Sequence, residues 1–353
     1  MPKKRIGLNV RYKGDVPPVY KDFKQLLEIV KDADNHYDEG IYYLGIPDFF
    51  ARRDPKRLHS FPYMAAIATV TQNVKFGPNV LEAPLFHPKH IADMSSSIDI
   101  MSNGRFILGV GLGVYEPGYK NFGVSWHDRG KILDEQLEVI TKLWTEAPAN
   151  YKGKFFQIEN EYSPPNIQKP HLPIWVGGGS EAAMRRSAQY GGEWAPSWWF
   201  VGLAEQENLE VLDKVVTSKT SVGVETGFNW KTALETYKKY CTKYGKELVL
   251  GRPPQGPKEV GFNISGFNFN INPDKEKALE EAKYFWVDVR KSRTQGGGSF
   301  ATKSKYAAIG KPSDVIEKIS EAYKIGANCV TLYPLSTNLK AQWERLKELL
   351  PSL

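Results

Sequence analysis

Eight short apolar runs alternate with stretches of helical periodicity along this chain, and that alternation restricts the fold more than any other feature. The runs are rich in Val, Ile and aromatic residues on both faces, which is typical of parallel strands covered by helices. Eight such units favour a closed barrel over an open sheet. The sequence therefore predicts an α/β fold, a (β/α)8 TIM-type barrel, with strands near residues 5–12, 41–46, 74–81, 106–110, 174–176, 192–196, 260–271 and 328–333.

The whole chain, residues 1–353, is expected to form this one barrel domain, because barrels routinely reach such lengths. The longest irregular inserts follow the second, fourth, sixth and seventh predicted strands. In a barrel these inserts lie at the carboxyl-terminal face, where the strands end and where ligands bind. We therefore expect the wall of an active site at that face.

Three consecutive glycines, Gly177, Gly178 and Gly179, follow the fifth predicted strand and lead into Ser180 and a helix. A loop without side chains can bring backbone N–H groups against a phosphate at a helix start, and Ser180 suits the N-cap position. The alternative is a tight strand-to-helix turn that binds nothing. Because one glycine would suffice for such a turn, the pattern favours an anion site.

The charge balance gives little reason to expect nucleic acid or membrane as a partner. The chain has 47 Lys and Arg against 40 Asp and Glu, a net charge of +7, and these charges are spread over probable helices. No window approaches the roughly 18 apolar residues of a membrane span, and no signal-peptide core is evident. We expect a cytoplasmic protein in which Cys241 and Cys329 are packed thiols.

Several motifs occur in an order that resembles one known family. They are Val74-Lys-Phe-Gly-Pro-Asn-Val80, Ser102-Asn-Gly-Arg-Phe-Ile-Leu-Gly-Val-Gly-Leu-Gly113, Tyr151-Lys-Gly-Lys-Phe-Phe156 and Leu172-Pro-Ile-Trp-Val-Gly-Gly-Gly-Ser180. No single motif is decisive, but together they are similar to the luciferase-like monooxygenase superfamily of (β/α)8 barrels. That superfamily includes flavin-dependent members and members that depend on the deazaflavin coenzyme F420, and the resemblance covers nearly the whole chain.

The resemblance implies a cofactor that lies across the barrel mouth. Its ring system would lie against the end of the third strand, at Asn79, Val80 and Leu81, backed by a cis Asn79–Val80 peptide. The loop after the fourth strand, with Gly111 and Gly113, would approach the ring. The turn of Gly177, Gly178, Gly179 and Ser180 would hold the phosphate.

The expected function is hydride transfer between F420 and a small organic substrate, because the Gly-Pro-Asn-Val stretch resembles the F420 branch, which includes methylenetetrahydromethanopterin reductases. The alternative is an FMN-dependent monooxygenase that uses reduced flavin and O2 and receives the flavin from a separate reductase. A second alternative is a barrel that binds flavin without catalysis. Since family members usually dimerise, a homodimer is expected.

One position departs from the family pattern. Many relatives have Asp-His at the end of the second strand, with the histidine near the cofactor, whereas this chain has Asp48-Phe49. Asp48 and Glu82 are therefore the expected catalytic acids, because a partly desolvated carboxyl at a strand end can have a raised pKa. Phe49 and Glu116 are assigned to the substrate pocket. Each carboxylate could instead be an ordinary loop residue in an ion pair.

Aromatic residues gather around the end of the sixth predicted strand, where Trp194 and Trp198 belong to a group of four within seven residues. We expect them to line the substrate pocket; the alternatives are a dimer contact or a place in the core. No metal site is expected, because His87 and His90 have no third ligand in register. The glycines at 109, 111 and 113 imitate a dinucleotide fingerprint, but their spacing does not fit it.

Overall fold

The computed structural model describes residues 4–10, 19–48, 58–197, 230–286, 300 and 304–353. Parallel strands occupy all eight predicted positions, so the expected order of strands and helices is confirmed. The strands are β1 (Ile6–Asn9), β2 (Ile41–Ile46), β3 (Lys75–Pro78) with β4 (Leu81–Glu82), β5 (Leu108–Gly111), β8 (Ile174–Gly177), β9 (Gly192–Ala195), β11 (Glu259–Phe262) with β12 (Ile264–Ile271), and β14 (Val330–Pro334).

The strands follow one another around a ring, but their pairing is divided into two parallel sheets. One sheet has the order β13-β12-β14-β1-β2-β3 and the other the order β10-β11-β9-β8-β5-β4. The sheets meet where the third strand is interrupted between β3 and β4, and where the seventh is interrupted between β11 and β12. Single bridges, Phe76 to Phe106 and Ser197 to Ser265, link the sheets at these two seams.

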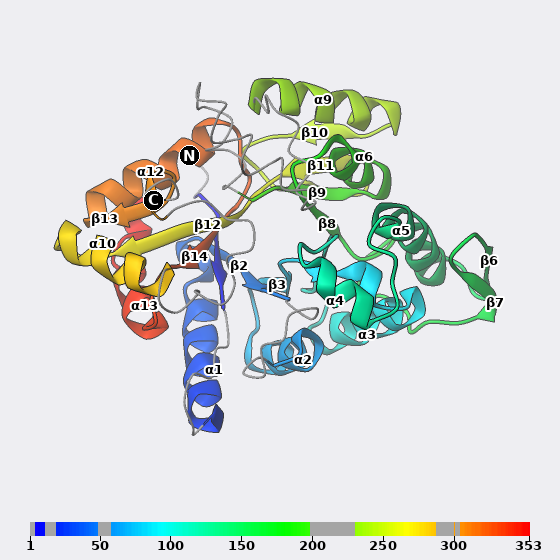
Figure 1. The fold of residues 1–353 in the computed structure, drawn as a ribbon, viewed down its shortest axis with the longest axis horizontal. Helices are drawn as coiled ribbons and strands as arrows, with labels where there is room; N and C mark the ends of the chain where they lie inside the picture. Colours follow the sequence, from blue (N-terminus) through cyan, green and yellow to red (C-terminus); the bar gives the residue numbers. More distant parts are fainter. Residues whose placement is uncertain (1–3, 11–18, 49–57, 198–229, 287–299, 301–303) are drawn as a thin grey trace.

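Helices connect successive strands and cover the outside of the ring (Figure 1). The helices α1, α2, α3, α5, α6 and α9 contact one another in chain order, and α10, α12 and α13 pack on the sheet that contains β12. The bounds of the helices are α1 (Val19–Asn35), α2 (Ser60–Val70), α3 (Pro88–Met101), α5 (Arg129–Thr145), α6 (Glu181–Tyr190), α9 (Trp230–Lys243), α10 (Lys275–Tyr284), α12 (Pro312–Lys324) and α13 (Leu339–Lys347).

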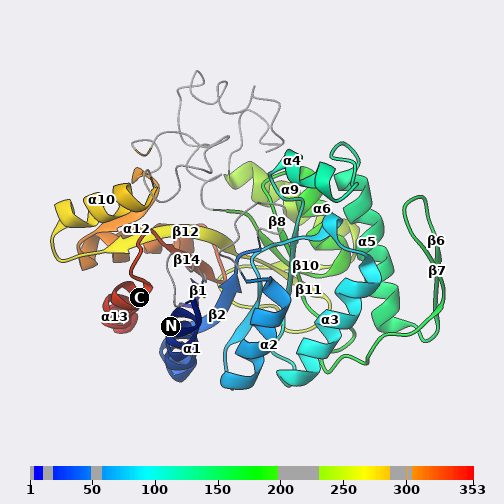
Figure 2. The same ribbon diagram turned by 60° about the horizontal axis from the view of Figure 1, so that its bottom comes forward.

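Several elements lie outside the repeating pattern. The Tyr151-Lys-Gly-Lys-Phe-Phe156 stretch, whose sequence predicts a hairpin, lies in one formed by β6 (Ala149–Lys152) and β7 (Gln157–Glu161), which projects from the edge of the molecule in Figure 2. The sequence did not predict the short strands β10 (Glu247–Val249) and β13 (Ala308–Gly310), nor the short helix α4 (Glu116–Asn121). The amphipathic pattern of residues 203–216 predicts a helix, but this stretch lies outside the described residues.

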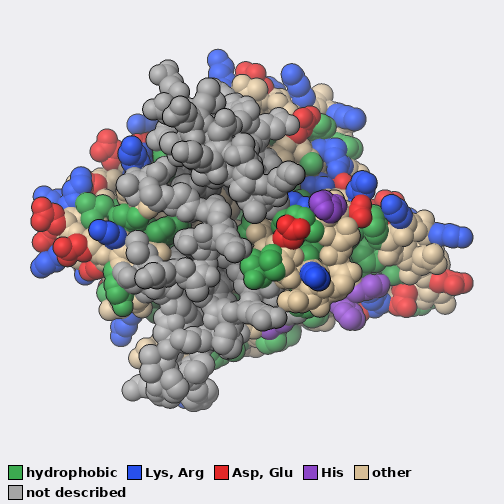
Figure 3. Space-filling model, viewed as in Figure 1, with side chains coloured by type: hydrophobic (Ala, Val, Ile, Leu, Met, Phe, Trp, Pro, Cys, Tyr) green, Lys and Arg blue, Asp and Glu red, His purple; other side chains and the backbone are tan. Residues whose placement is uncertain are grey.

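The surface and the cysteines agree with the sequence analysis where the structure describes them. On the face shown in Figure 3, acidic and basic side chains alternate around the rim. Cys241 and Cys329 are both buried free thiols, as predicted. Within the described ranges, none of the helices combines the length and the apolar character needed to cross a bilayer.

Large rings fill the interior of the ring of strands near its amino-terminal end. Tyr43, Ile107, Trp175 and Cys329 form a small buried cluster there, separate from the main core between strands and helices. The rings of Tyr43 and Trp175 have centroids 4.4 Å apart, and the Tyr43 hydroxyl donates to the carbonyl of Gly77.

Two glycines allow the third and fourth strands to approach one another closely at a seam. A Cβ at Gly77 would lie 1.8 Å from the carbonyl oxygen of Ile107, and one at Gly109 would lie 2.0 Å from that of Pro78. Both neighbours are backbone atoms, which cannot move aside without distorting a strand. The seam therefore requires glycine at both positions.

Replacing Gly109 with alanine should lower the free energy of unfolding by roughly 1–3 kcal/mol or more, because overpacked strands have to separate. The matched control is Gly130→Ala in α5, where the nearest atom to a new Cβ is the end of the Arg186 side chain, 3.4 Å away. That variant should be neutral or more stable by up to about 1 kcal/mol. Urea unfolding curves measure both, and equal stability of the two variants would contradict this account of the seam.

Candidate functional site at the carboxyl end of the strands

The interruption of the third strand places the side chain of Val80 over the ends of the next two strands. The Asn79–Val80 peptide is cis, as the family resemblance implied. A Cβ at Gly111 would lie 2.5 Å from Cγ2 of Val80, and one at Gly177 would lie 3.1 Å from Cγ1. Glycine at 111 and 177 is thus needed to accommodate Val80. This packing role is separate from any contact with a cofactor.

Asp48 and Glu82 lie together at the ends of β2 and β4. The backbone N–H of Glu82 donates to Oδ2 of Asp48 at 3.2 Å, and both residues are buried. The Glu82 carboxyl packs on Gly113, where an added Cβ would lie 2.9 Å from Oε1. Gly113 itself has a φ of +69°, which favours glycine. The structure therefore brings two predicted catalytic residues and one predicted cofactor-binding glycine together.

The helix α4 adds a tyrosine to this group that the sequence analysis did not identify. Tyr119 is fully buried, and its hydroxyl donates to the carbonyl of Leu112. Burial raises the pKa of Tyr119, and the nearby Glu82 carboxylate raises it further. Glu116, by contrast, is exposed at the first position of α4. Glu82, unlike Glu116, is thus buried, and it lies beside Tyr119.

The turn after β8 has the geometry that the sequence predicted for Ser180. Ser180 is the N-cap of α6, and its hydroxyl accepts the N–H of Ala183 at 3.3 Å. Gly178 has a φ of +104°, and among the described residues the one atom close to an added Cβ would be the Cβ of Ala183 at 3.7 Å. The described part of the chain therefore leaves room on the side of Gly178 where a side chain would be, unlike at Gly111.

Trp194 contacts this turn from the core side and does not line an open surface. Its indole N–H donates to the carbonyl of Gly178 at 2.8 Å, and the side chain is fully buried. It packs against the rings of Trp230, Tyr237 and Phe262. The alternative of a place in the core, which the sequence left open, thus describes Trp194. Two other pocket assignments, Phe49 and Trp198, lie outside the described residues.

Comparison with known proteins decides the family. Residues 5–216 match the family model described as luciferase-like monooxygenase, which is more than half of the chain. The chain belongs to the luciferase-like monooxygenase family. One relative is the oxygenase component of the flavin-dependent trigonelline monooxygenase of Acinetobacter baylyi, 28% identical over 157 residues, which are 44% of this chain and 42% of the relative. The chain spans about half the length of the curated relatives it matches.

Solved structures with this fold include an F420-dependent dehydrogenase and a monooxygenase component in complex with FMN. The monooxygenase RslO1 from Streptomyces bottropensis has a TM-score of 0.71 at 18% identity, with 99% of this chain and 98% of that chain covered. An F420-dependent secondary alcohol dehydrogenase has the same TM-score at 16% identity, with 99% of each chain covered. At such identities the likeness shows the fold, which is that of the luciferase-like barrels.

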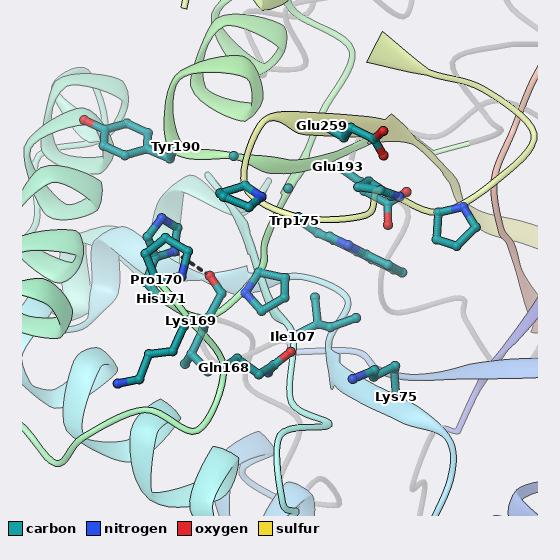
Figure 4. A pocket seen from close by; sticks show the side chains of 18 of the residues that line it. Lys75, Ile107, Gln168, Lys169, Pro170, His171, Trp175, Tyr190, Glu193 and Glu259 are labelled. Carbon is teal, nitrogen blue, oxygen red and sulfur yellow. Dashed lines mark hydrogen bonds between the residues drawn. The ribbon is translucent and has the colours of Figure 1, made fainter. Parts of the chain in front are cut away.

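A pocket of about 250 Å³ lies at the opposite, amino-terminal end of this luciferase-like barrel. Its lining includes the first residues of three strands, Lys75, Gly192 and Glu259. Trp175 and Ile107 form an apolar floor, and the loops 168–173 and 253–257 form the walls (Figure 4). The sequence analysis did not predict this pocket.

Glu193 is the buried carboxyl group of that pocket and the second functional candidate that sequence reasoning missed. It lies beside Trp175 in the strand register, and Nδ2 of Asn328 donates to its Oε2 at 3.2 Å. Burial raises the pKa of Glu193 to about 7, although Asn328, Asn263 and Arg5 act to lower it. A charged residue inside an otherwise apolar strand, Gly-Glu-Trp-Ala, was the available signal.

Metal ligation has no support in the part of the chain that the structure describes. Within those ranges, no group of three or more His, Cys, Asp or Glu residues is arranged to hold a metal ion. His87 and His90 have ring centroids 5.9 Å apart, and His87 instead caps α3 by accepting the N–H of Lys89.

The pH dependence of stability tests the state of Glu193. Its pKa in the folded chain, about 7, exceeds the ordinary value of 4.5, so the folded state holds the proton more tightly than the unfolded state. The stability that this proton contributes should be present at about pH 4.5 and lost as the pH rises to about 7. Relative to Glu193→Gln, the chain should lose on the order of 3 kcal/mol across that range.

Urea unfolding at about pH 5 and about pH 8 measures this difference. Glu193→Gln keeps the size of the side chain and removes the titration. Parallel stability profiles for the two proteins would contradict a raised pKa at Glu193.

Proposed function

We propose that this luciferase-like barrel transfers a hydride between F420 and a small organic substrate at the carboxyl end of its strands. The observation that carries this proposal is the turn at Gly178, which the described residues leave open, beside the N-cap Ser180 and one strand away from Val80. F420 would supply the hydride-accepting or hydride-donating carbon, and the protein would position that carbon and exclude water. The residues of the site have separable tasks in this scheme.

The turn suits a phosphate because of its backbone. The first N–H groups of a helix have no partners within the helix, and the helix dipole favours an anion there. In α6 the Ser180 hydroxyl accepts a hydrogen bond from the N–H of Ala183. The backbone N–H groups that precede Ala183 in the turn would then be the ones to bind a ligand. The one carboxylate in the first turn, Glu181, accepts a hydrogen bond from the Tyr240 hydroxyl at 2.5 Å. That contact directs its charge toward α9.

The ring of the cofactor would lie against Val80, whose own packing on Gly111 and Gly177 holds it in place. Asp48 and Glu82 are buried beside this surface and close to one another. Two carboxyl groups in a shared, partly desolvated site tend to have different affinities for a proton. One of them, with Glu82 the first choice, would accept the proton of the substrate hydroxyl as the hydride leaves for the cofactor, or donate a proton to the carbonyl oxygen when the hydride moves the other way.

A second candidate function is supported by the relatives rather than by the site. The trigonelline relative is a flavin-dependent monooxygenase with a separate oxygenase component. An FMN-dependent monooxygenase here would use the same turn for the flavin phosphate and would need a reductase to supply reduced flavin. Oxygen dependence distinguishes the two functions.

The charge at position 180 tests the phosphate contact. Asp and Asn are both good N-caps, so Ser180→Asp and Ser180→Asn should leave the stability of α6 similar. Only Asp adds a negative charge beside the proposed phosphate. We expect Ser180→Asp to weaken F420 binding at least about tenfold, a loss of about 1.4 kcal/mol, and Ser180→Asn to stay within about threefold.

Titrations of F420, followed by its fluorescence, and parallel titrations of FMN measure these affinities. Equal affinity of the Asp and Asn variants for both cofactors would show that the turn holds no phosphate.

Replacing Glu82 tests the proton exchange. Under anaerobic conditions, the wild-type protein should reduce F420 with a member of a panel of alcohols, sugar phosphates and reduced pterins. Glu82→Gln should lower kcat by roughly 10²–10⁴-fold and leave F420 affinity nearly unchanged, because general acid–base catalysis contributes about that factor. Asp48→Asn, measured in parallel, identifies which carboxyl carries the proton.

Turnover that requires O2, FMN and a reductase, with none on F420, would contradict the F420 proposal and support the second candidate. Binding of either cofactor with no turnover on the whole panel would support a non-catalytic barrel.

A further inference from the structure

The amino-terminal pocket has no task in the chemistry proposed above, because it lies at the other end of the strands. Its floor is nevertheless built from residues of the barrel interior. Trp175 on β8 and Glu193 on β9 are register neighbours, and Gly109 is the neighbour of Trp175 on the other side. The indole and the carboxyl lie next to one another in the middle of the pocket (Figure 4).

The Glu193 carboxyl lies where the paired residue on the next strand, Gly261, has no side chain. Gly261 on β11 pairs with Glu193, and a Cβ at Gly261 would lie 2.4 Å from Oε2 of Glu193. The carboxyl thus points into the barrel interior, with an exposed fraction of only 5%. A buried carboxylate in this position needs hydrogen-bond donors to offset its desolvation.

The protein supplies one of these donors and leaves capacity for more. A carboxylate has about four lone-pair sites. Nδ2 of Asn328 donates to Oε2 of Glu193 at 3.2 Å, and the charge of Arg5 acts on the carboxyl from longer range. An N–H or O–H from a ligand would fill one of the remaining sites.

Three other charged groups of the pocket, Lys75, Lys246 and Glu259, are already engaged. Lys75 donates to the carbonyl of Gly104 at 2.8 Å, and Lys246 donates to that of Pro257. Glu259 accepts both ends of the Arg252 guanidinium, at 2.7 Å each. Glu193 is therefore the polar group best placed to select a ligand.

The rest of the lining suits a flat apolar molecule. Trp175 and Ile107 are each 3% exposed, and Tyr42 and Tyr190 add aromatic surface. The walls contain five prolines, whose rings present flat apolar faces: Pro170, Pro173, Pro253, Pro254 and Pro257. A volume of about 250 Å³ is slightly below that of pockets for drug-sized ligands and fits one or two fused rings.

We propose that this pocket is a second binding site, for a small planar aromatic molecule of the indole or azole class, with its ring against Trp175 and its single ring N–H donated to Glu193. The proposal is independent of the cofactor and reaction assigned to the carboxyl end. A matched pair of probes tests it. Indole has the required N–H, whereas benzofuran has the same bicyclic shape without a donor.

Isothermal titration calorimetry at about pH 8, above the pKa of Glu193, measures both probes on the full chain, saturated with FMN or F420 to occupy the other end. We expect indole to bind with a Kd of roughly 0.1–1 mM, as its size allows. Benzofuran should bind at least about tenfold more weakly, because it leaves the carboxylate one donor short.

Two isosteric variants locate the binding. Glu193→Gln removes the charge and should weaken indole binding about five- to tenfold. Glu259→Gln changes a carboxylate that lines the same pocket but is bound to Arg252, and it should stay within about twofold. Melting curves confirm that both variants fold, and the comparison of probes on the wild-type chain needs no variant.

Three results would overturn the proposal. They are equal affinity for indole and benzofuran, an equal effect of the two variants, and no heat of binding for indole up to about 5 mM.

Discussion

The packing of Val80 on backbone without side chains is the constraint on which the carboxyl end of this barrel depends. Its two methyl carbons lie 2.5 and 3.1 Å from the positions that a Cβ on Gly111 and on Gly177 would take. A larger residue at position 111 would therefore clash with Val80, and one at position 177 would require a small shift. Because Asn79 also donates its N–H to the Ile46 carbonyl, the same interruption ties the third strand to the second. Asp48 and Glu82 follow directly on these two strands.

The two ends of the barrel therefore differ in chemistry. At the amino-terminal end, Tyr43 and Trp175 fill the interior, and Glu193 is the buried acid among them. At the carboxyl end, glycines and a single valine form a low surface beside two buried carboxyl groups. Under the functions proposed above, a flat cofactor ring would lie at the second end, and a small planar molecule would bind between the prolines of the first. The luciferase-like family membership accounts for the carboxyl end and leaves the other unassigned.

Much of this fold could be predicted from the sequence because it rests on local patterns. The eight strands, the Ser180 cap and the 151–156 hairpin each follow from apolar runs, turn residues and capping chemistry that lie within a few positions of one another. The short strands β10 and β13 have no such pattern, since they exist only by pairing with β11 and β12. The contacts of the site could not be predicted for the same reason. Asp48 contacts Glu82, and Tyr119 lies near Glu82, although these residues are far apart in the sequence.

The sequence assigned Trp194 to the substrate pocket, whereas the structure places its side chain in the core. Trp194 looked like pocket wall because it stands in an aromatic run, but its alternation along β9 turns it toward α9 and away from the interior. The neighbouring Glu193 takes the inward position for the same reason. A one-residue shift in a strand exchanges the two faces, and the composition of residues 192–196 could not decide which side each faced.

A crystal structure of the chain with F420 bound is the measurement that tests the central claim most directly. The account predicts the deazaflavin ring against Val80, with Glu82 at its edge, and the phosphate within hydrogen-bond distance of backbone N–H groups between Gly178 and Ala182. A cofactor bound elsewhere on the barrel, or a ring at the carboxyl end whose phosphate makes no contact with that turn, would contradict it.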